Sequence, residues 1–263
     1  MRTLNFVAGA AAVALVLFAG VAAQAANFSV TLEAPGVQNS TANFASKGVE
    51  NFNSLKTGGN QSFSTDYGTG GAVTGVYSGV DIRSASKYGG AGGSGNFAST
   101  TGGASYSVSL STTNPNGINY FGFDLSALDA GNSLSFFKGN TLVFSFTPTT
   151  LLSMINGNSA YFGNPNADFQ GQDKKEAFAF VNFFDTAGTF DKVVFSETPK
   201  VGEYESDNQT VGFFTQQSGT TVPGVSVSGV PEPATWAMTF IGLGCAGASL
   251  RSARRTALQA TAA

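Results

Sequence analysis

Short runs in which apolar and polar residues alternate recur along most of this chain. They occur at Phe28–Leu32 and at residues 72–82, 105–110 and 118–125. A period of two is typical of a β-strand that buries one face. These runs therefore predict several half-buried strands.

The clearest pair of strands lies in residues 133–146, which read SLSFFKGNTLVFSF. Lys138-Gly139-Asn140 stands between two alternating runs, and Gly and Asn tolerate the positive φ of a tight turn. This segment predicts a β-hairpin, with Leu142, Phe144 and Phe146 on one side.

One later run differs, because residues 177–184 (AFAFVNFF) are apolar on both faces. It predicts a central strand that is covered on each side. Further short strands are expected at 190–195 and 211–214, and only Thr149–Ile155 (TTLLSMI) has a helical pattern. Many short strands with almost no helix predict an all-β protein, an antiparallel β-sandwich of jelly-roll type.

The N-terminal segment has a different character. Arg2 precedes an uncharged apolar run at residues 6–23, which ends in Ala23-Gln24-Ala25. This order is that of a secretory signal peptide, residues 1–25, with cleavage after Ala25. A retained membrane helix is the alternative. Residues 26–219 are then expected to form the exported domain, and residues 220–230 a linker.

Composition narrows the chemistry of that domain. The chain has no His and a net charge of −3, and Cys245, its one cysteine, lies beyond the domain. A disulfide, a histidine-based nucleophile and a His/Cys zinc site are therefore excluded there, as is a nucleic-acid surface that needs a basic stripe. The many Phe residues are expected to mark the core. A hydrolase with paired carboxylates stays open, although no spacing singles out such a pair.

A glycine-rich segment at residues 89–103 is expected to be a flexible loop. Its residues 90–95 match G-x-G-x-x-G, the dinucleotide-binding motif. That motif needs a following helix to receive the pyrophosphate, and residues 96–103 have no helical pattern. We therefore interpret it as a surface loop.

Two stretches carry oxygen ligands of the kind that Ca²⁺ prefers. If the chain is extended, Glu203, Glu205 and Asp207 share one face, and the alternative is a solvated charged loop. Residues 164–168 (NPNAD) begin like an EF-hand loop but continue with Phe169 where the loop needs Gly. We interpret them as an Asn-rich turn.

The C-terminal tail is uncharged from residue 234 to residue 250, which is near the minimum length for a transmembrane helix. Arg251, Arg254 and Arg255 follow it, so the positive-inside rule leaves the C-terminus in the cytoplasm. Trp236 is placed as an interfacial anchor. A buried core helix would not explain the arginines. We predict a single transmembrane helix.

The tail also resembles a known sorting signal in its order of Pro231-Glu232-Pro233, Trp236, an apolar run, and Arg254 and Arg255. It is similar to the PEP-CTERM domain, in its PEPxxWA form, of Gram-negative bacteria that make exopolysaccharide. The same domain is also known as the ice-binding protein C-terminal domain. The resemblance covers residues 231–258 and implies cleavage near Pro231-Glu232-Pro233 by an exosortase, a membrane-embedded cysteine transpeptidase. It implies a transient inner-membrane intermediate and then the cell surface or extracellular matrix.

The exported domain is similar to exosortase-dependent surface proteins in residues 120–137, 161–184 and 190–211. Comparable jelly-roll modules hold a structural Ca²⁺ between a Glu near the first strand and an Asp near the last. The resemblance implies Glu50 and Asp207 as the metal ligands here.

These observations predict an exported surface or matrix protein with a structural or adhesive domain, able to bind carbohydrate and Ca²⁺ and not an enzyme. Its partners would be the exosortase and exopolysaccharide, with no nucleic acid. One alternative is a glycan-directed hydrolase with two carboxylates. Another is an ice-binding protein, for which the threonines, such as Thr112-Thr113 and Thr149-Thr150, are too scattered.

Overall fold

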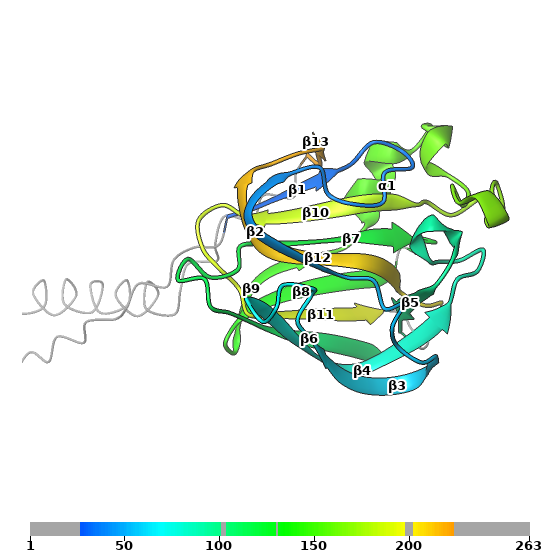
Figure 1. Ribbon diagram of the computed structural model, residues 1–263. Coiled ribbons are helices and arrows are strands. Elements are labelled where there is room, and N and C mark those ends of the chain that lie inside the picture. Colours follow the sequence, from blue (N-terminus) through cyan, green and yellow to red (C-terminus); the bar gives the residue numbers. More distant parts are fainter. Residues whose placement is uncertain (1–26, 101–103, 130, 198–201, 224–263) are drawn as a thin grey trace, which may run out of the picture. The chain divides into compact units, whose positions relative to one another are not determined.

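The computed structural model describes residues 27–100, 104–129, 131–197 and 202–223, which all lie in one compact unit. They form a 13-stranded antiparallel sheet. The sheet curls so that one half packs over the other (Figure 1). The protein is therefore mostly β, as the alternating sequence predicts, and its two layers are consistent with a sandwich.

The first layer has the strand order β13-β1-β10-β7-β12-β2. β10 lies between β1 and β7, and all seven of its residues are buried, which confirms the predicted central strand. The strands are β1 (Phe28–Leu32), β2 (Asn43–Glu50), β7 (Tyr120–Ser126), β10 (Ala179–Asp185), β12 (Glu205–Gln216) and β13 (Thr220–Thr221).

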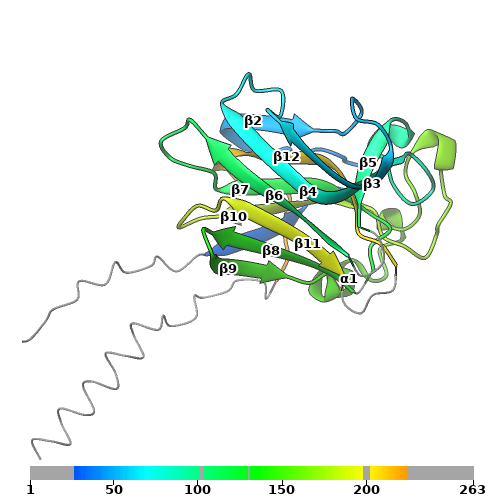
Figure 2. The same ribbon diagram turned by 90° about the horizontal axis from the view of Figure 1, so that it is seen from below.

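The second layer has the strand order β3-β4-β6-β11-β8-β9. These strands are labelled in Figure 2, which shows the protein from below. Its strands are β3 (Gly58–Thr65), β4 (Val73–Ser84), β6 (Ser105–Thr112), β8 (Asn132–Lys138), β9 (Thr141–Phe146) and β11 (Lys192–Glu197). The short β5 (Asn96–Ser99) pairs with both β4 and β12 and so joins the two layers.

Aromatic rings fill the space between the layers. Phe28 of β1 stacks on Phe144 of β9 with centroids 4.3 Å apart, and Phe123 of β7 meets Phe195 of β11 edge-on at 5.1 Å. Such pairs add to the free energy gained by burying large apolar surfaces. The prediction that the Phe positions mark the core is confirmed.

The hairpin and the helix are also confirmed: β8 and β9 pair around the Lys138–Thr141 turn, and α1 spans Thr149–Ile155. One detail of the hairpin was wrong. Phe144 and Phe146 are buried, but Leu142 is 53% exposed. The register shifts between Phe136 and Phe137, so the residues near the turn do not keep the alternation of the rest.

Both ends of the described chain leave the first layer on the same side. β13 runs antiparallel to β1, with Thr221 opposite Thr31, and Val222 N–H donates to the Val30 carbonyl oxygen. Pro223 therefore leaves beside the start of β1. Hydrogen bonds from this segment run past the expected domain end at residue 219, so the first residues of the expected linker belong to the folded body.

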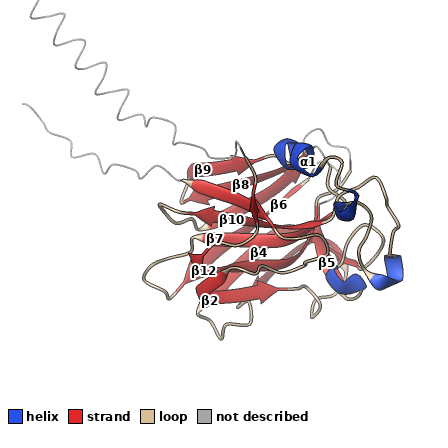
Figure 3. Cartoon of the chain, turned by 90° about the horizontal axis from the view of Figure 1, so that it is seen from above, coloured by secondary structure: helices blue, strands red, loops and turns tan. Residues whose placement is uncertain are grey.

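The helices gather at the other end of the strands (Figure 3). They are α1 and the short 3₁₀ segments η1 (Ala91–Gly93), η2 (Ser159–Tyr161) and η3 (Ala167–Phe169). The antiparallel order places the last residue of β7 and the first residue of β12 at this end as well. The loops that meet there build the site described next.

Candidate functional site

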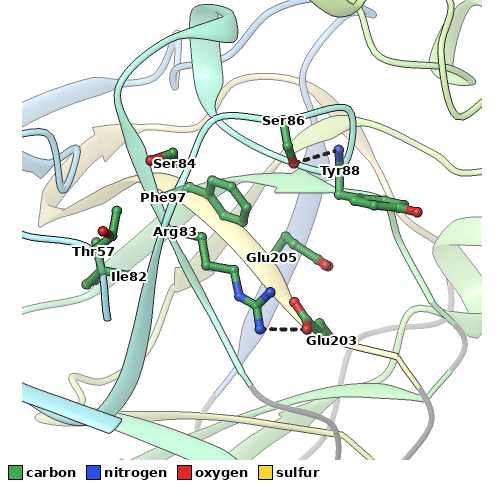
Figure 4. A pocket seen from close by; sticks show the side chains of 9 residues that line it. All are labelled: Thr57, Ile82, Arg83, Ser84, Ser86, Tyr88, Phe97, Glu203 and Glu205. Atoms are coloured by element: carbon green, nitrogen blue, oxygen red, sulfur yellow. Dashed lines mark hydrogen bonds and ion pairs between the residues drawn. The ribbon is translucent and has the colours of Figure 1, made fainter. Parts of the chain in front are cut away.

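A groove with acidic walls lies at the end of the strands opposite Asn27 and Pro223. It consists of two adjoining hollows, of about 360 and 390 Å³, that share Arg83, Tyr88, Glu203 and Glu205. Figure 4 shows the carboxyl groups of Glu203 and Glu205 and the ring of Tyr88 around the first hollow. We call this feature the acidic groove, and its second hollow adds Asp129, Asp173 and Glu176.

Glu203 is held in place by two partners from distant parts of the chain. The Arg83 guanidinium lies 2.6 Å from Glu203 Oε1, and the Ser99 hydroxyl donates to Glu203 Oε2 at 3.1 Å. The Arg83 side chain is 42% exposed, so this ion pair contributes little to stability. Its main effect is to fix the position of a carboxylate in the groove (Figure 4).

Glu205 is the buried acid of the groove. Tyr204 and Ser206, its neighbours along the chain, are both buried. Ser206 Oγ bonds the Tyr106 hydroxyl in the core, so the alternation of an extended chain turns Glu205 the other way. Glu205 is only 6% exposed, and its Oε2 has no hydrogen-bond partner among the described residues.

The environment of Glu205 favours its neutral form. Its pKa is raised to about 8, mainly by burial; the charges of Glu203 and Asp129 contribute to this rise, and a backbone hydrogen bond and Arg83 oppose it. Glu205 therefore carries a proton at neutral pH. A protonated carboxyl group in the groove wall can donate a hydrogen bond to a ligand.

The other acids of the groove reinforce one another. Burial raises the pKa of Asp129 and of Glu176, and the charge of Asp173 adds to both shifts. On the rim, the Tyr88 ring is 45% exposed, and Lys87 Nζ lies 4.5 Å from its centre. An exposed aromatic ring beside a run of carboxyl groups is a suitable surface for a polar ligand.

The two residues assigned to Ca²⁺ by resemblance, Glu50 and Asp207, lie outside the groove. The structure brings them near each other: Glu50 pairs with Gln209 across β2 and β12, two positions beyond Asp207. Asp207 is 2% exposed, and burial, followed by the charge of Glu50, raises its pKa to about 7. Burial and the charge of Asp207 likewise raise the pKa of Asp124, its cross-strand neighbour, well above the usual value.

Backbone N–H groups already contact both of these carboxylates. Glu50 Oε1 accepts from Phe52 N–H at 2.7 Å, and Asp207 accepts from Ala91 and Asn208 N–H at 2.7 and 2.6 Å. A carboxylate has about four lone-pair sites, so these bonds leave room for a cation. Ca²⁺ takes several oxygen ligands, and within the described part of the chain no three acidic, His or Cys side chains gather closely enough to hold a metal ion by themselves.

The acidic stretch of residues 203–207 is therefore divided between two places. Glu203 and Glu205 enter the groove, whereas Asp207 bonds the loop at η1. Glu205 and Asp207 keep the regular register that puts them on one face of β12, as predicted, but the loop at η1 separates Asp207 from the groove. Sequence reasoning also missed Arg83 and Tyr88, which come from β4 and the loop after it.

The glycine-rich loop leads into a strand, β5, and so lacks the helix that a dinucleotide site requires, as predicted. It is better packed than a flexible loop, because Ala91 N–H bonds Asp207 and Gly90 accepts from Asn166 Nδ2 at 3.0 Å. The Asn-rich turn is confirmed: Asn166 N–H donates to Asn164 Oδ1 at 2.9 Å, and Phe169 N–H donates to the Asn166 carbonyl oxygen at 3.0 Å. Asn164 Nδ2 also donates to the Lys87 carbonyl oxygen at 3.1 Å, next to Tyr88.

Other predictions fall on residues outside the described part of the chain. They are the signal cleavage at Ala25, the transmembrane helix at 234–250 and the sorting residues Pro231, Glu232, Pro233, Trp236, Arg254 and Arg255. Of the helices in the described part, none is long and apolar enough to cross a membrane.

Comparisons with known proteins match no family model to this chain and find no similar curated protein.

Proposed function

We propose that this chain is an exported, exosortase-processed protein of the cell surface or extracellular matrix. Its folded body would be a jelly-roll-like β-sandwich that acts as a structural or adhesive module and not as an enzyme. The tail with Pro231-Glu232-Pro233, its apolar run and its arginines supports the sorting step. The route would pass through the inner membrane to the surface, where exopolysaccharide is the natural partner.

The observation that carries the adhesive role is the placement of the groove. Asn27 and Pro223 leave one end of the strands, and the acidic groove lies at the other. The groove therefore lies away from Pro223, the last described residue on the side from which the tail continues. The connections from β6 to β7, β7 to β8 and β9 to β10 all change layers, which supports a jelly-roll topology.

A structural Ca²⁺ belongs to the same proposal. Glu50 and Asp207 would hold it next to the loop at η1, and its charge would offset the repulsion among Glu50, Asp207 and Asp124. The ion would link β2, β12 and the glycine-rich loop.

Mass spectrometry of the mature protein from culture fractions tests the sorting proposal. The expected product begins after Ala25, lacks the residues beyond Pro231-Glu232-Pro233, and is found in the surface or matrix fraction. Replacement of the Pro-Glu-Pro motif by Ala-Ala-Ala should leave an uncut, membrane-bound chain. A full-length product that stays inside the cell with both ends uncut would overturn the proposal.

A glycan-directed hydrolase remains the second candidate, and one observation favours it. Glu205 is kept protonated beside Glu203, a carboxylate paired with Arg83. One proton donor and one carboxylate in one groove are the two groups that glycoside hydrolysis uses. An assay for new reducing ends with purified exopolysaccharide tests it, with Glu205→Gln as the variant that should abolish any activity.

A further inference from the structure

The acidic residues of the groove outnumber the basic residues that line it. Glu203, Asp129, Asp173 and Glu176 line it with Glu205, and Arg83 is its one basic lining residue among those described. Arg83 is already paired with Glu203, at 2.6 Å, and lies near Asp81, at 3.7 Å. Lys87, at the rim, lies over the Tyr88 ring. A positively charged ligand would relieve this repulsion.

A second observation points to a ligand independently of the acidic cluster. Glu205 is 94% buried, it lines both hollows, and its Oε2 has no partner. A buried polar atom without a partner costs free energy, so a ligand that bonds it gains affinity. Figure 4 shows this carboxyl group on the side of the hollow that Tyr88 borders.

The shape and the other lining groups indicate what kind of cation fits. Two adjoining hollows of about 360 and 390 Å³ are large for a single ion and suit an organic ligand with more than one ring. Tyr88 offers an exposed flat face, and the hydroxyl groups of Ser84, Ser86 and Thr57 border the first hollow. Hydroxyl groups and an aromatic face match a sugar ring better than they match a peptide backbone, which would need an open strand edge.

We propose that the acidic groove binds a polysaccharide with protonated amino groups, that is, a glycan with de-N-acetylated amino sugars. Its ammonium groups would pair with Glu203, Asp129, Asp173 and Glu176. A ring hydroxyl would form a hydrogen bond with the unpartnered Oε2 of Glu205, and one sugar ring would stack on Tyr88. This inference gives a ligand class to the adhesive module and so rests on the proposed function.

Calorimetric titration of the purified full-length chain in mild detergent tests the proposal. The probes are glucosamine oligomers, N-acetylglucosamine oligomers of the same length, and a lysine peptide of matched charge. The expected result is binding of the glucosamine oligomers that is at least about tenfold tighter than that of the other two, and that weakens as salt is added.

Three variants assign the binding to the groove. Glu203→Gln and Tyr88→Ala should each weaken binding about tenfold, whereas Asp66→Asn, which lies at the opposite end of β4 from the groove, should leave it unchanged. Circular dichroism verifies that each variant is folded. Because Tyr88 is exposed, its variant keeps the test valid if Glu203→Gln fails to fold.

Several results would overturn the inference. They are equal binding of acetylated and free-amine oligomers, equal binding of the lysine peptide, displacement of the oligomer by millimolar Ca²⁺, and no binding at all. A mature protein that is correctly cut and exported but binds no glucosamine oligomer would reject this inference alone and leave the proposed sorting intact.

Discussion

At the scale of single residues, the core contains a polar network that the Phe-rich composition does not reveal. Gln209 is fully buried; its Oε1 accepts from the Tyr77 hydroxyl at 2.7 Å, and its Nε2 donates to the Tyr106 hydroxyl at 2.7 Å. The Tyr67 and Tyr77 hydroxyls also lie 3.0 Å apart. The network links β4, β6 and β12 across the two layers.

Replacing Tyr77 by Phe tests this network. The ring would still pack, but Gln209 Oε1 and the Tyr67 hydroxyl would lose a buried partner, so we expect a loss of about 1–3 kcal/mol in the free energy of unfolding. Urea denaturation measures it. Tyr88→Phe, which removes an exposed hydroxyl, is the control and should change stability by less than about 0.5 kcal/mol. Equal stability of both variants would mean that the network is not closed as described.

Glu205 gives a second prediction at this scale. Burial raises its folded pKa to about 8, so the stability that its proton provides is complete below the usual carboxyl pKa and is lost as pH rises through 8. Glu205→Gln keeps the shape of the side chain and cannot ionise, so the variant does not lose this stability as pH rises. Between pH 5 and pH 9, the free energy of unfolding of the variant should therefore rise by about 4 kcal/mol relative to that of the unchanged chain. Asp66→Asn is the matched control, and a gain of the same size in that variant would contradict the assignment.

At the scale of the strands, the sequence predicted those with regular apolar positions and missed β2 and β3, which end the two layers, and the short β5. β1, β7 and β10 carry regular apolar positions because both neighbouring strands and the facing layer cover them. β2 and β3 have mostly exposed or half-exposed residues, so their alternation uses small and polar side chains and gives no apolar signal.

The site could be predicted only in part for a related reason. Glu203, Glu205 and Asp207 could be selected as acids two residues apart, but their partners come from β4 and the loops beyond it. Which loop covers a strand end depends on the pairing of distant strands through β5. No short stretch of sequence contains that information.

The pairing of β2 with β12 gives the prediction at this scale. A Cβ added to Gly212 of β12 would overlap the Ser46 carbonyl oxygen of β2, and a backbone atom cannot move without shifting the strand. Gly212→Ala should therefore destabilise the protein by about 3 kcal/mol or more.

Gly68→Ala is the matched control. The space around Gly68 is open, so only its positive φ of 71° adds strain, on the order of 1 kcal/mol. Thermal denaturation of both variants gives the comparison. If Gly212→Ala were no more costly than Gly68→Ala, β2 would not pair closely at this point.

At the scale of the whole molecule, buried acids determine how stability changes with pH. Burial raises the pKa of Asp207 to about 7 and that of Glu205 to about 8. It also raises the pKa of Asp124 well above its usual value. Glu33 behaves in the opposite way: burial would raise its pKa, but hydrogen bonds from Ser218, Thr41 and Asn182 outweigh that and lower it. Glu33 therefore stabilises the fold above its usual pKa and loses this effect only in acid.

These opposed shifts predict how the molecule as a whole responds to pH and to Ca²⁺. The three raised acids bind protons more tightly when folded, so in the absence of metal the free energy of unfolding should fall steadily from pH 5 to pH 9. Ca²⁺ held by Glu50 and Asp207 would favour the ionised Asp207 and should raise the melting temperature at pH 8 by about 5 °C, but by little at pH 5. Melting curves in EDTA and in 1 mM Ca²⁺ measure both effects. Asp207→Asn should remove the response to Ca²⁺ and keep the Glu205 part of the pH slope, whereas Asp66→Asn should keep both. If Ca²⁺ produced the same shift in Asp207→Asn, the cation would bind elsewhere, and the raised acids at this end of β12 would stabilise the fold through their protons alone.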